Sequence, residues 1–235
     1  MKSEVQLYQM FDNETASYTY IIADSLTGEA AIIDPVLECL SRDLKLIIEL
    51  GFKLKYILDT HIHADHITGA GELRKLTHAL TGVSAAAGVA CVDLPLSDKQ
   101  ELFLGSKKIE VWSTPGHTDT CVSYLFEGMV FTGDALLIRG CGRTDFQNGS
   151  AEELFDSVRT KLFSLADETK IYPAHDYNGQ TSSTIGLEKK FNARLNLSLA
   201  KDDFVKIMSN LKLEMPRKIK ESVPANLACG QLAKK

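Results

Sequence analysis

The chain has 235 residues, of which 44% are hydrophobic and 24% charged, and this composition excludes disordered and fibrous proteins. The formal charge is −5. Because residues 201–235 hold eight basic and four acidic side chains, residues 1–200 carry −9, which argues against nucleic acid as a partner. No stretch of about 18 uninterrupted apolar residues occurs, so we expect no membrane span.

The chain begins with MKSEVQLYQMFDNE, which has neither the apolar core of a signal peptide nor an Arg-rich presequence. We therefore expect a cytoplasmic location.

Further along, two runs of β-branched and aromatic residues, 18–23 and 30–34, flank a turn at Thr27 and Gly28 and predict a β-hairpin. Apolar residues at helical spacing then predict a helix over 39–50 that ends at Gly51.

The middle and end of the chain alternate between strand and helix patterns. Strands are predicted over residues 54–58, 107–112, 122–126, 129–132 and 170–172. One helix is predicted to carry Leu73, Leu76 and Leu80 on one face. A second begins at a capping box at Ser150 and buries the stripe Leu154, Phe155, Val158 and Leu162. Two more are predicted around Leu187 and Phe204. Two blocks of strands, each followed by helices, predict an α/β fold of two packed sheets with helices outside.

Five of the six histidines lie in short polar motifs that each follow a predicted strand. The motifs contain seven candidate ligands: His61, His63, Asp65, His66, His117, Asp134 and His175. Loops that follow strands gather at one edge of a sheet, and imidazole and carboxylate are ligands that zinc, iron and manganese prefer. Without a cation so many polar groups would be poorly satisfied, so the sequence predicts a metal site. His78 has no companion motif and is expected to be a surface or satisfied residue.

The five cysteines are widely scattered, and none forms a CxxC pair. A disulfide framework is therefore not expected, which favours a reducing compartment. Cys39, Cys91 and Cys121 lie in apolar surroundings and are expected to behave as small core residues. For Cys141 and Cys229 a structural role and a redox role are both open.

His-x-His-x-Asp-His, followed in order by Gly-His117, Gly-Asp134 and His175, resembles the metallo-β-lactamase superfamily. The resemblance implies an αββα sandwich, in which two mixed or mostly antiparallel β-sheets are flanked by helices and the metal lies between loops at one edge. Since no linker is evident, we expect a single metallo-β-lactamase-type domain over residues 1–235, with a C-terminal helical extension from about residue 181 packed on it.

Two enzyme branches of that superfamily share all seven positions. Residues 59–61, 140–147, 172–177 and 224–230 together resemble persulfide dioxygenases, also called sulfur dioxygenases, of the glyoxalase II-related branch. The alternative is a hydroxyacylglutathione hydrolase of the glyoxalase II type, which uses two metals to cleave a glutathione thioester. The sixty residues after His175 leave little room for the helical domain that those hydrolases append. A third reading is a metal-stabilised binding protein without turnover.

The persulfide dioxygenase resemblance implies one Fe(II) per chain, bound by the catalytic residues His61, His117 and Asp134 in a facial triad. Four further side chains would orient ligands and bound water through hydrogen bonds: His63, Asp65, His66 and His175. Arg194, expected on the helix after the last metal loop, and Tyr177 would contact the substrate. The implied reaction converts glutathione persulfide, O2 and water into glutathione and sulfite. A homodimer is left open.

Overall fold

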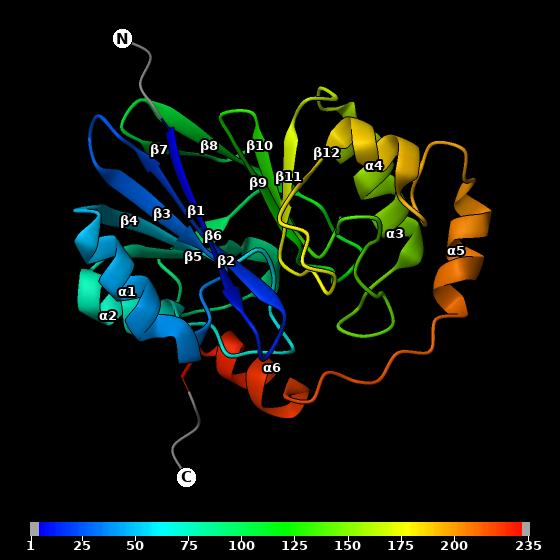
Figure 1. Cartoon of the computed structure of the whole chain (residues 1–235). Helices are drawn as coiled ribbons and strands as arrows, with labels where there is room; N and C mark the ends of the chain where they lie inside the picture. Colours follow the sequence, from blue (N-terminus) through cyan, green and yellow to red (C-terminus); the bar gives the residue numbers. More distant parts are fainter. Residues whose placement is uncertain (1–4, 232–235) are drawn as a thin grey trace.

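The computed structural model describes residues 5–231, which form two facing β-sheets with helices on their outer sides (Figure 1). The first sheet contains, in spatial order, β1 (Val5–Asp12), β2 (Ser17–Asp24), β3 (Glu29–Ile33), β4 (Lys53–Leu58), β5 (Leu80–Ser84) and β6 (Leu94–Leu96). The second contains β12 (Ser183–Thr184), β11 (Lys170–Pro173), β10 (Met129–Gly133), β9 (Val122–Phe126), β8 (Lys107–Ser113) and β7 (Glu101–Leu104).

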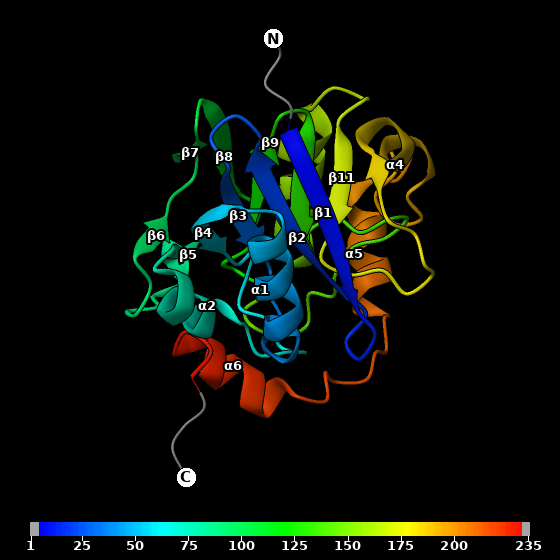
Figure 2. The same ribbon diagram turned by 60° about the vertical axis from the view of Figure 1, so that its left-hand side comes forward.

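Both sheets are mixed. Strands β1 to β3 pair antiparallel and β3 to β6 parallel, whereas the second sheet is antiparallel except for the pairing of β10 with β11. Helices α1 (Leu40–Glu49) and α2 (Ala70–Thr77) lie beside the first sheet (Figure 2). Helices α3 (Ala151–Asp156), α4 (Ile185–Phe191) and α5 (Lys201–Ser209) lie beside the second, and α6 (Ile219–Leu227) crosses below both (Figure 1). The αββα prediction is confirmed.

Aromatic side chains fill the space between the sheets and also reach toward one edge of them. The rings of Tyr20 and Phe131 lie 5.0 Å apart between centroids, and both side chains are almost fully buried. The Tyr20 hydroxyl donates to the carbonyl of Pro173 at 2.6 Å, and the Tyr124 hydroxyl donates to the carbonyl of Asp59 at 2.6 Å. Both buried hydroxyls therefore have hydrogen-bond partners, and these bonds fix the backbone where β11 and β4 end.

Most local predictions agree with the structure. Helix α1 ends before Gly51, which adopts φ 68°, and the Ser150 hydroxyl accepts a hydrogen bond from the amide of Glu153 at the start of α3. From α3 the chain continues through a π-helical segment (Ser157–Lys161) and a 3-10 turn (Leu162–Ser164), which together bury the predicted apolar stripe.

The prediction for α2 was wrong at its end. This helix stops at Thr77, His78 caps it in the left-handed conformation, and Leu80 begins β5. Leu73 is buried, but Leu76 is 56% exposed. The helical spacing of leucines in the sequence runs on to Leu80, past the end of the helix. The left-handed residue that ends the helix is a histidine, so no glycine or proline marks the end in the sequence. His78 is exposed, as expected.

The expectation of unpaired cysteines is wrong for two of the five. Cys91 and Cys229 form a disulfide, although 138 positions separate them. Helix α6 returns to the first sheet, so the two Cα atoms lie 6.1 Å apart, and spacing along the chain does not reveal this. Cys39, Cys121 and Cys141 are free, and the latter two are buried.

None of the helices within residues 5–231 has the length and apolar character needed to cross a bilayer. The division of residues 1–235 into one domain with a helical extension from about residue 181 stays a prediction.

Cys91→Ser should lower the free energy of unfolding by about 2 to 5 kcal/mol, since a cross-link that closes a long loop restricts the unfolded chain. Chemical denaturation measures this change. Dithiothreitol should bring the parent to the stability of the variant and leave the variant itself unaffected. A variant as stable as the oxidised parent would show that the disulfide adds nothing.

Candidate metal centre

The predicted ligands come together at the edge of the sandwich where four strands end. The segment 59–68 follows β4, His117 follows β8, Asp134 follows β10 and His175 follows β11. Gly133, the residue before Asp134, has φ 51°, and a Cβ there would lie 2.6 Å from the Thr60 hydroxyl. A glycine is therefore required where β10 passes the loop after β4.

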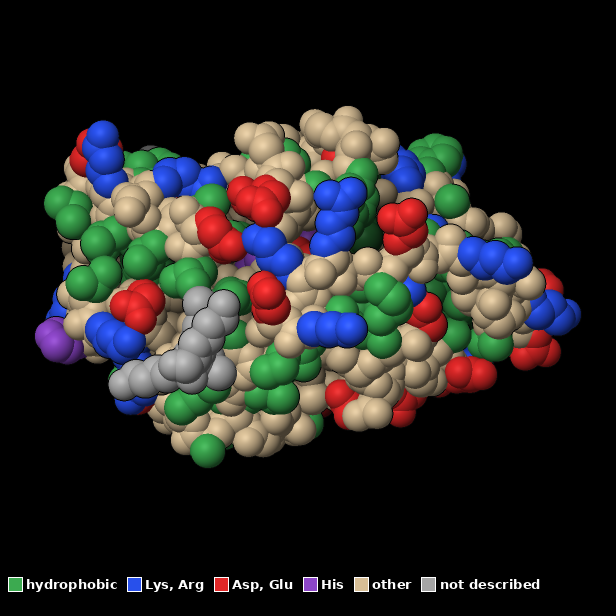
Figure 3. All heavy atoms as spheres, turned by 90° about the horizontal axis from the view of Figure 1, so that it is seen from below, with side chains coloured by type: hydrophobic (Ala, Val, Ile, Leu, Met, Phe, Trp, Pro, Cys, Tyr) green, Lys and Arg blue, Asp and Glu red, His purple; other side chains and the backbone are tan. Residues whose placement is uncertain are grey.

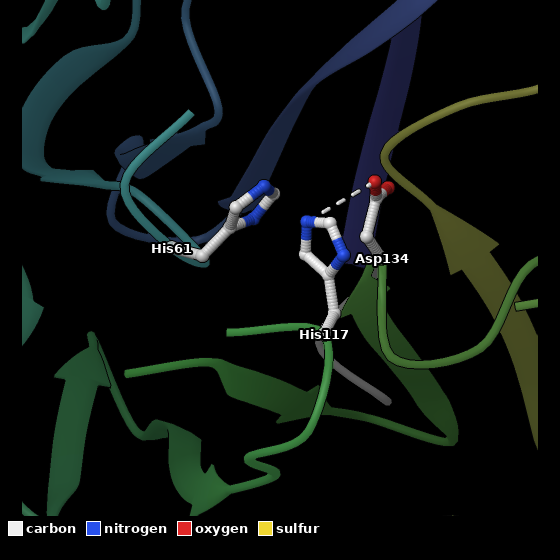
Figure 4. Close-up of side chains that lie close together, drawn as sticks. All are labelled: His61, His117 and Asp134. Carbon is white, nitrogen blue, oxygen red and sulfur yellow. Dashed lines mark ion pairs between the residues drawn. The ribbon is translucent and has the colours of Figure 1, made fainter. Parts of the chain in front are cut away.

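Three side chains face one another at this edge: His61, His117 and Asp134 (Figure 4). Their ligand atoms lie within 4.8 Å of one another, and His117 Nε2 is 3.6 Å from Asp134 Oδ2. His61 is 2% and His117 5% exposed. Two imidazoles and one carboxylate in this arrangement can hold a metal ion and leave other coordination positions open.

Hydrogen bonds on the far side of each ring fix which nitrogen faces the centre. His117 Nδ1 donates to the carbonyl of Arg143 at 2.6 Å, which leaves Nε2 toward Asp134. His61 Nδ1 lies 3.0 Å from the Thr60 hydroxyl, which leaves its Nε2 as the ligand atom. Partners of this kind hold the tautomer and ring orientation that a metal ligand needs.

The other four predicted residues surround this group. His66 Nδ1 lies 3.0 Å from Asp65 Oδ2, and His175 Nε2 lies 3.6 Å from the same oxygen. His63 turns its Nε2 toward Asp34 Oδ1 at 3.1 Å. His175 Nε2 is also 3.8 Å from Asp134 Oδ1. The structure thus places all seven side chains in one cluster. The carboxylate that holds His63 belongs to Asp34, which the sequence analysis placed only at the end of a predicted strand.

The protonation states of His61 and Asp65 suit a cation, whereas His63 is itself held as a cation by Asp34. Burial, together with His63 and His117, lowers the pKa of His61 well below its usual value, so this ring is neutral. Burial raises the pKa of Asp65, but His66 and His175 outweigh it and hold that pKa well below the usual value. Burial also lowers the pKa of His63, but Asp34 outweighs this and raises it to about 9.

Several buried polar atoms of the cluster have no hydrogen-bond partner within the described chain: His63 Nδ1, His66 Nε2 and Asp134 Oδ1. Buried polar atoms normally find partners, and a bound metal and its waters would supply them. The residues present therefore fit a metal ion.

A cavity of about 550 Å³ opens above this cluster, and the predicted substrate residues lie on its wall. Tyr177 is 73% exposed and stacks parallel to the His175 ring at 6.0 Å between centroids. Arg194 is half-buried and donates to the carbonyl of Cys141 at 3.1 Å. The prediction that Arg194 lies on a helix was wrong, because α4 ends at Phe191 and the Asn192 side chain caps the turn that follows.

Two residues that hold the site had no predicted role: Arg143 on the cavity wall and Asp34, buried beside the metal loop. Arg143 pairs with Asp145 at 2.6 Å and donates to the carbonyls of Leu213 and Glu214, so it ties the segment between α5 and α6 to the site. Asp34 accepts hydrogen bonds from the Thr60 amide and hydroxyl at 2.7 and 2.9 Å. Arg143 stood in the Gly-Cys-Gly-Arg segment, whereas nothing in the sequence distinguished Asp34 from an ordinary residue at the end of a strand.

Comparisons with known proteins agree with this geometry. The family model of the metallo-beta-lactamase superfamily matches residues 12–103 and 92–175. Persulfide dioxygenase ETHE1 from Mus musculus, described as mitochondrial, is 48% identical over 96% of this chain and 89% of its own length. The crystal structure of ETHE1 from Myxococcus xanthus aligns with a TM-score of 0.94 at 47% identity, covering 96% of this chain and 100% of that one. Glyoxylase B2 from Dictyostelium discoideum is 30% identical over 100% of this chain and 93% of its own length.

Proposed function

The chain belongs to the metallo-β-lactamase superfamily and, within it, to the persulfide dioxygenase family, and we propose that it oxidises glutathione persulfide with O2 at one Fe(II) ion. The observation that carries the proposal is the group of His61, His117 and Asp134 at the base of a cavity, in a chain 48% identical to a persulfide dioxygenase. In the proposed reaction one persulfide, one O2 and one water give one glutathione thiol and one sulfite.

The chain's own residues would prepare this reaction by position and charge. When bound, Fe(II) supplies open coordination positions and the electron transfer that a spin-paired sulfur cannot easily make with O2 directly. His117 is held by the Arg143 carbonyl and His61 by the Thr60 hydroxyl, so both rings present a fixed nitrogen. Asp134 supplies the anionic ligand, and its second oxygen faces His175.

Glutathione presents two carboxylates, and Arg194 is the cation on the cavity wall best able to bind one. Arg143 is also on the wall, but its guanidinium already pairs with Asp145 and donates to two carbonyls. The guanidinium of Arg194 contacts only Cys141 within the described chain, through its carbonyl and its thiol, which leaves further N–H groups for substrate. Tyr177, which stacks on His175 and lines the same cavity, would add a hydroxyl contact.

The alternative hydrolase is less supported, because the identity to the glyoxylase is 30% and that to the persulfide dioxygenase 48%. A binding protein without turnover is set aside on the same comparison. A cytoplasmic location and a homodimer stay predictions, and the mouse relative is described as mitochondrial.

Purified without added metal, the protein should contain one iron per chain. Asp134→Ala should abolish iron retention because it removes the anionic ligand, whereas Asp65→Ala, the matched control, should weaken activity and leave some iron bound. Elemental analysis with protein quantification measures both. Two zinc ions per active chain, partly lost in Asp65→Ala, would establish the hydrolase instead.

Turnover of glutathione persulfide should consume oxygen in proportion to the sulfite formed. An oxygen electrode and sulfite assay run on the same sample give the ratio. Equal rates with and without air, or rapid cleavage of a glutathione thioester, would contradict the proposal.

Arg194→Ala should lower kcat/KM for glutathione persulfide about ten- to a hundredfold, since a hydrogen bond to a charged group contributes roughly 1.5 to 3 kcal/mol. Iron content should not change. Arg74→Ala is the control, because that guanidinium pairs with Asp93 away from the cavity. Unchanged kinetics, or a loss explained by missing iron, would overturn the assignment of Arg194.

A further inference from the structure

Helix α6 lies beneath the metal loop although some 160 residues separate the two in sequence (Figures 1 and 2). Both ends of the helix are anchored. Lys218, just before it, pairs with Glu38 at 2.8 Å and Glu14 at 3.1 Å. Cys229, just after it, forms the disulfide with Cys91. Seen from below, the molecule shows basic and acidic side chains interspersed with hydrophobic ones (Figure 3).

Asn226 of α6 forms hydrogen bonds with the metal loop. Its side-chain Nδ2 donates to the carbonyls of His63 at 2.8 Å and His66 at 2.9 Å. Its Oδ1 accepts from the amide of Thr68 at 2.9 Å. The side chain is 4% exposed. One buried amide therefore holds three backbone groups of the loop that carries four of the seven clustered side chains.

This set of contacts requires the chemistry of an asparagine. The loop offers two carbonyls and one N–H at this point, and a primary amide has two donors and an acceptor to match them. An aspartate of the same shape keeps the acceptor but turns both donor positions into acceptors that face carbonyl oxygens. The fit is also close after the helix, where a Cβ on Gly230 would lie 2.3 Å from the carbonyl of Thr68.

We propose that Asn226 is a positioning residue for the metal centre: it fixes the backbone of residues 63–68 from below, so that His61, the proposed metal ligand on this loop, holds its position. From above, Asp34 holds the same loop through Thr60 and His63. His61 lies between Thr60, which Asp34 holds, and residues 63–68, which Asn226 holds. Since His117 and Asp134 lie on other loops, a shift of the loop that carries His61 changes the spacing of the metal ligands. The inference rests on the proposed metal-binding role of His61.

The test uses the metal-free protein titrated with Co(II), whose visible absorption reports ligand geometry. Asn226→Ala and Asn226→Asp should each bind Co(II) about ten- to a hundredfold more weakly than the parent, as is typical when a residue that orients metal ligands is removed. Their Co(II) spectra should change in shape. Ser222→Ala is the matched control, because Ser222 is buried on the same helix and its hydroxyl has no hydrogen-bond partner in the described chain.

Thermal unfolding of each metal-free variant separates positioning from stability. If a folded Asn226 variant loses thermal stability but binds Co(II) with the parent's affinity and spectrum, the residue is structural only and the proposal is wrong. If Asn226→Ala does not fold, Asn226→Asp, which keeps the side-chain shape, carries the same test. A parent that binds one metal but consumes no O2 would overturn the proposed dioxygenase and leave this result standing.

Discussion

The structure depends on burying a highly polar loop at the edge of two hydrophobic sheets. Residues 59–68 carry three imidazoles and two carboxylates, and most of these side chains are less than a tenth exposed. Burial of such groups is unfavourable unless each finds a partner. Asp34 supplies three of these contacts, because its carboxylate accepts from the Thr60 amide and hydroxyl and pairs with His63.

The hydrophobic core and the polar edge support each other. Tyr124 packs between the sheets and donates its hydroxyl to the Asp59 carbonyl, and Thr68 donates to the Asp59 carboxylate. The core side chains thereby fix where the loop begins. Since the loop has no regular secondary structure of its own, its conformation comes from these long-range hydrogen bonds, which is how a metal site becomes organised before metal binds.

Local patterns predicted two packed sheets with helices outside and the clustered ligands, because strand periodicity and the polar ends of strands are local features, and the family resemblance added the αββα arrangement. Gly51 and Ser150 marked helix ends correctly for the same reason. What the sequence could not show was contact between distant segments. The pairing of Cys91 with Cys229 and the role of Asn226 arise because α6 returns to the loop, and the place of Arg194 after α4 follows from the Asn192 cap.

The same seven side chains could hold one metal ion or two. The hydrogen bonds that each candidate ligand atom already makes bear on which of the two the site binds. Within the described residues, His61 Nε2, His117 Nε2 and the Asp134 carboxylate have no hydrogen bond that would compete with a metal. His63 Nδ1 and His66 Nε2 are unpartnered as well. Asp65 differs, because its Oδ2 already accepts from His66 at 3.0 Å and from Ser17 at 3.2 Å. A second metal bound through this oxygen of Asp65 would compete with hydrogen bonds to a charged group, each worth about 1.5 to 3 kcal/mol. The hydrogen bonds at Asp65 Oδ2 are therefore the feature of this chain that agrees with the one ion that we propose at His61, His117 and Asp134.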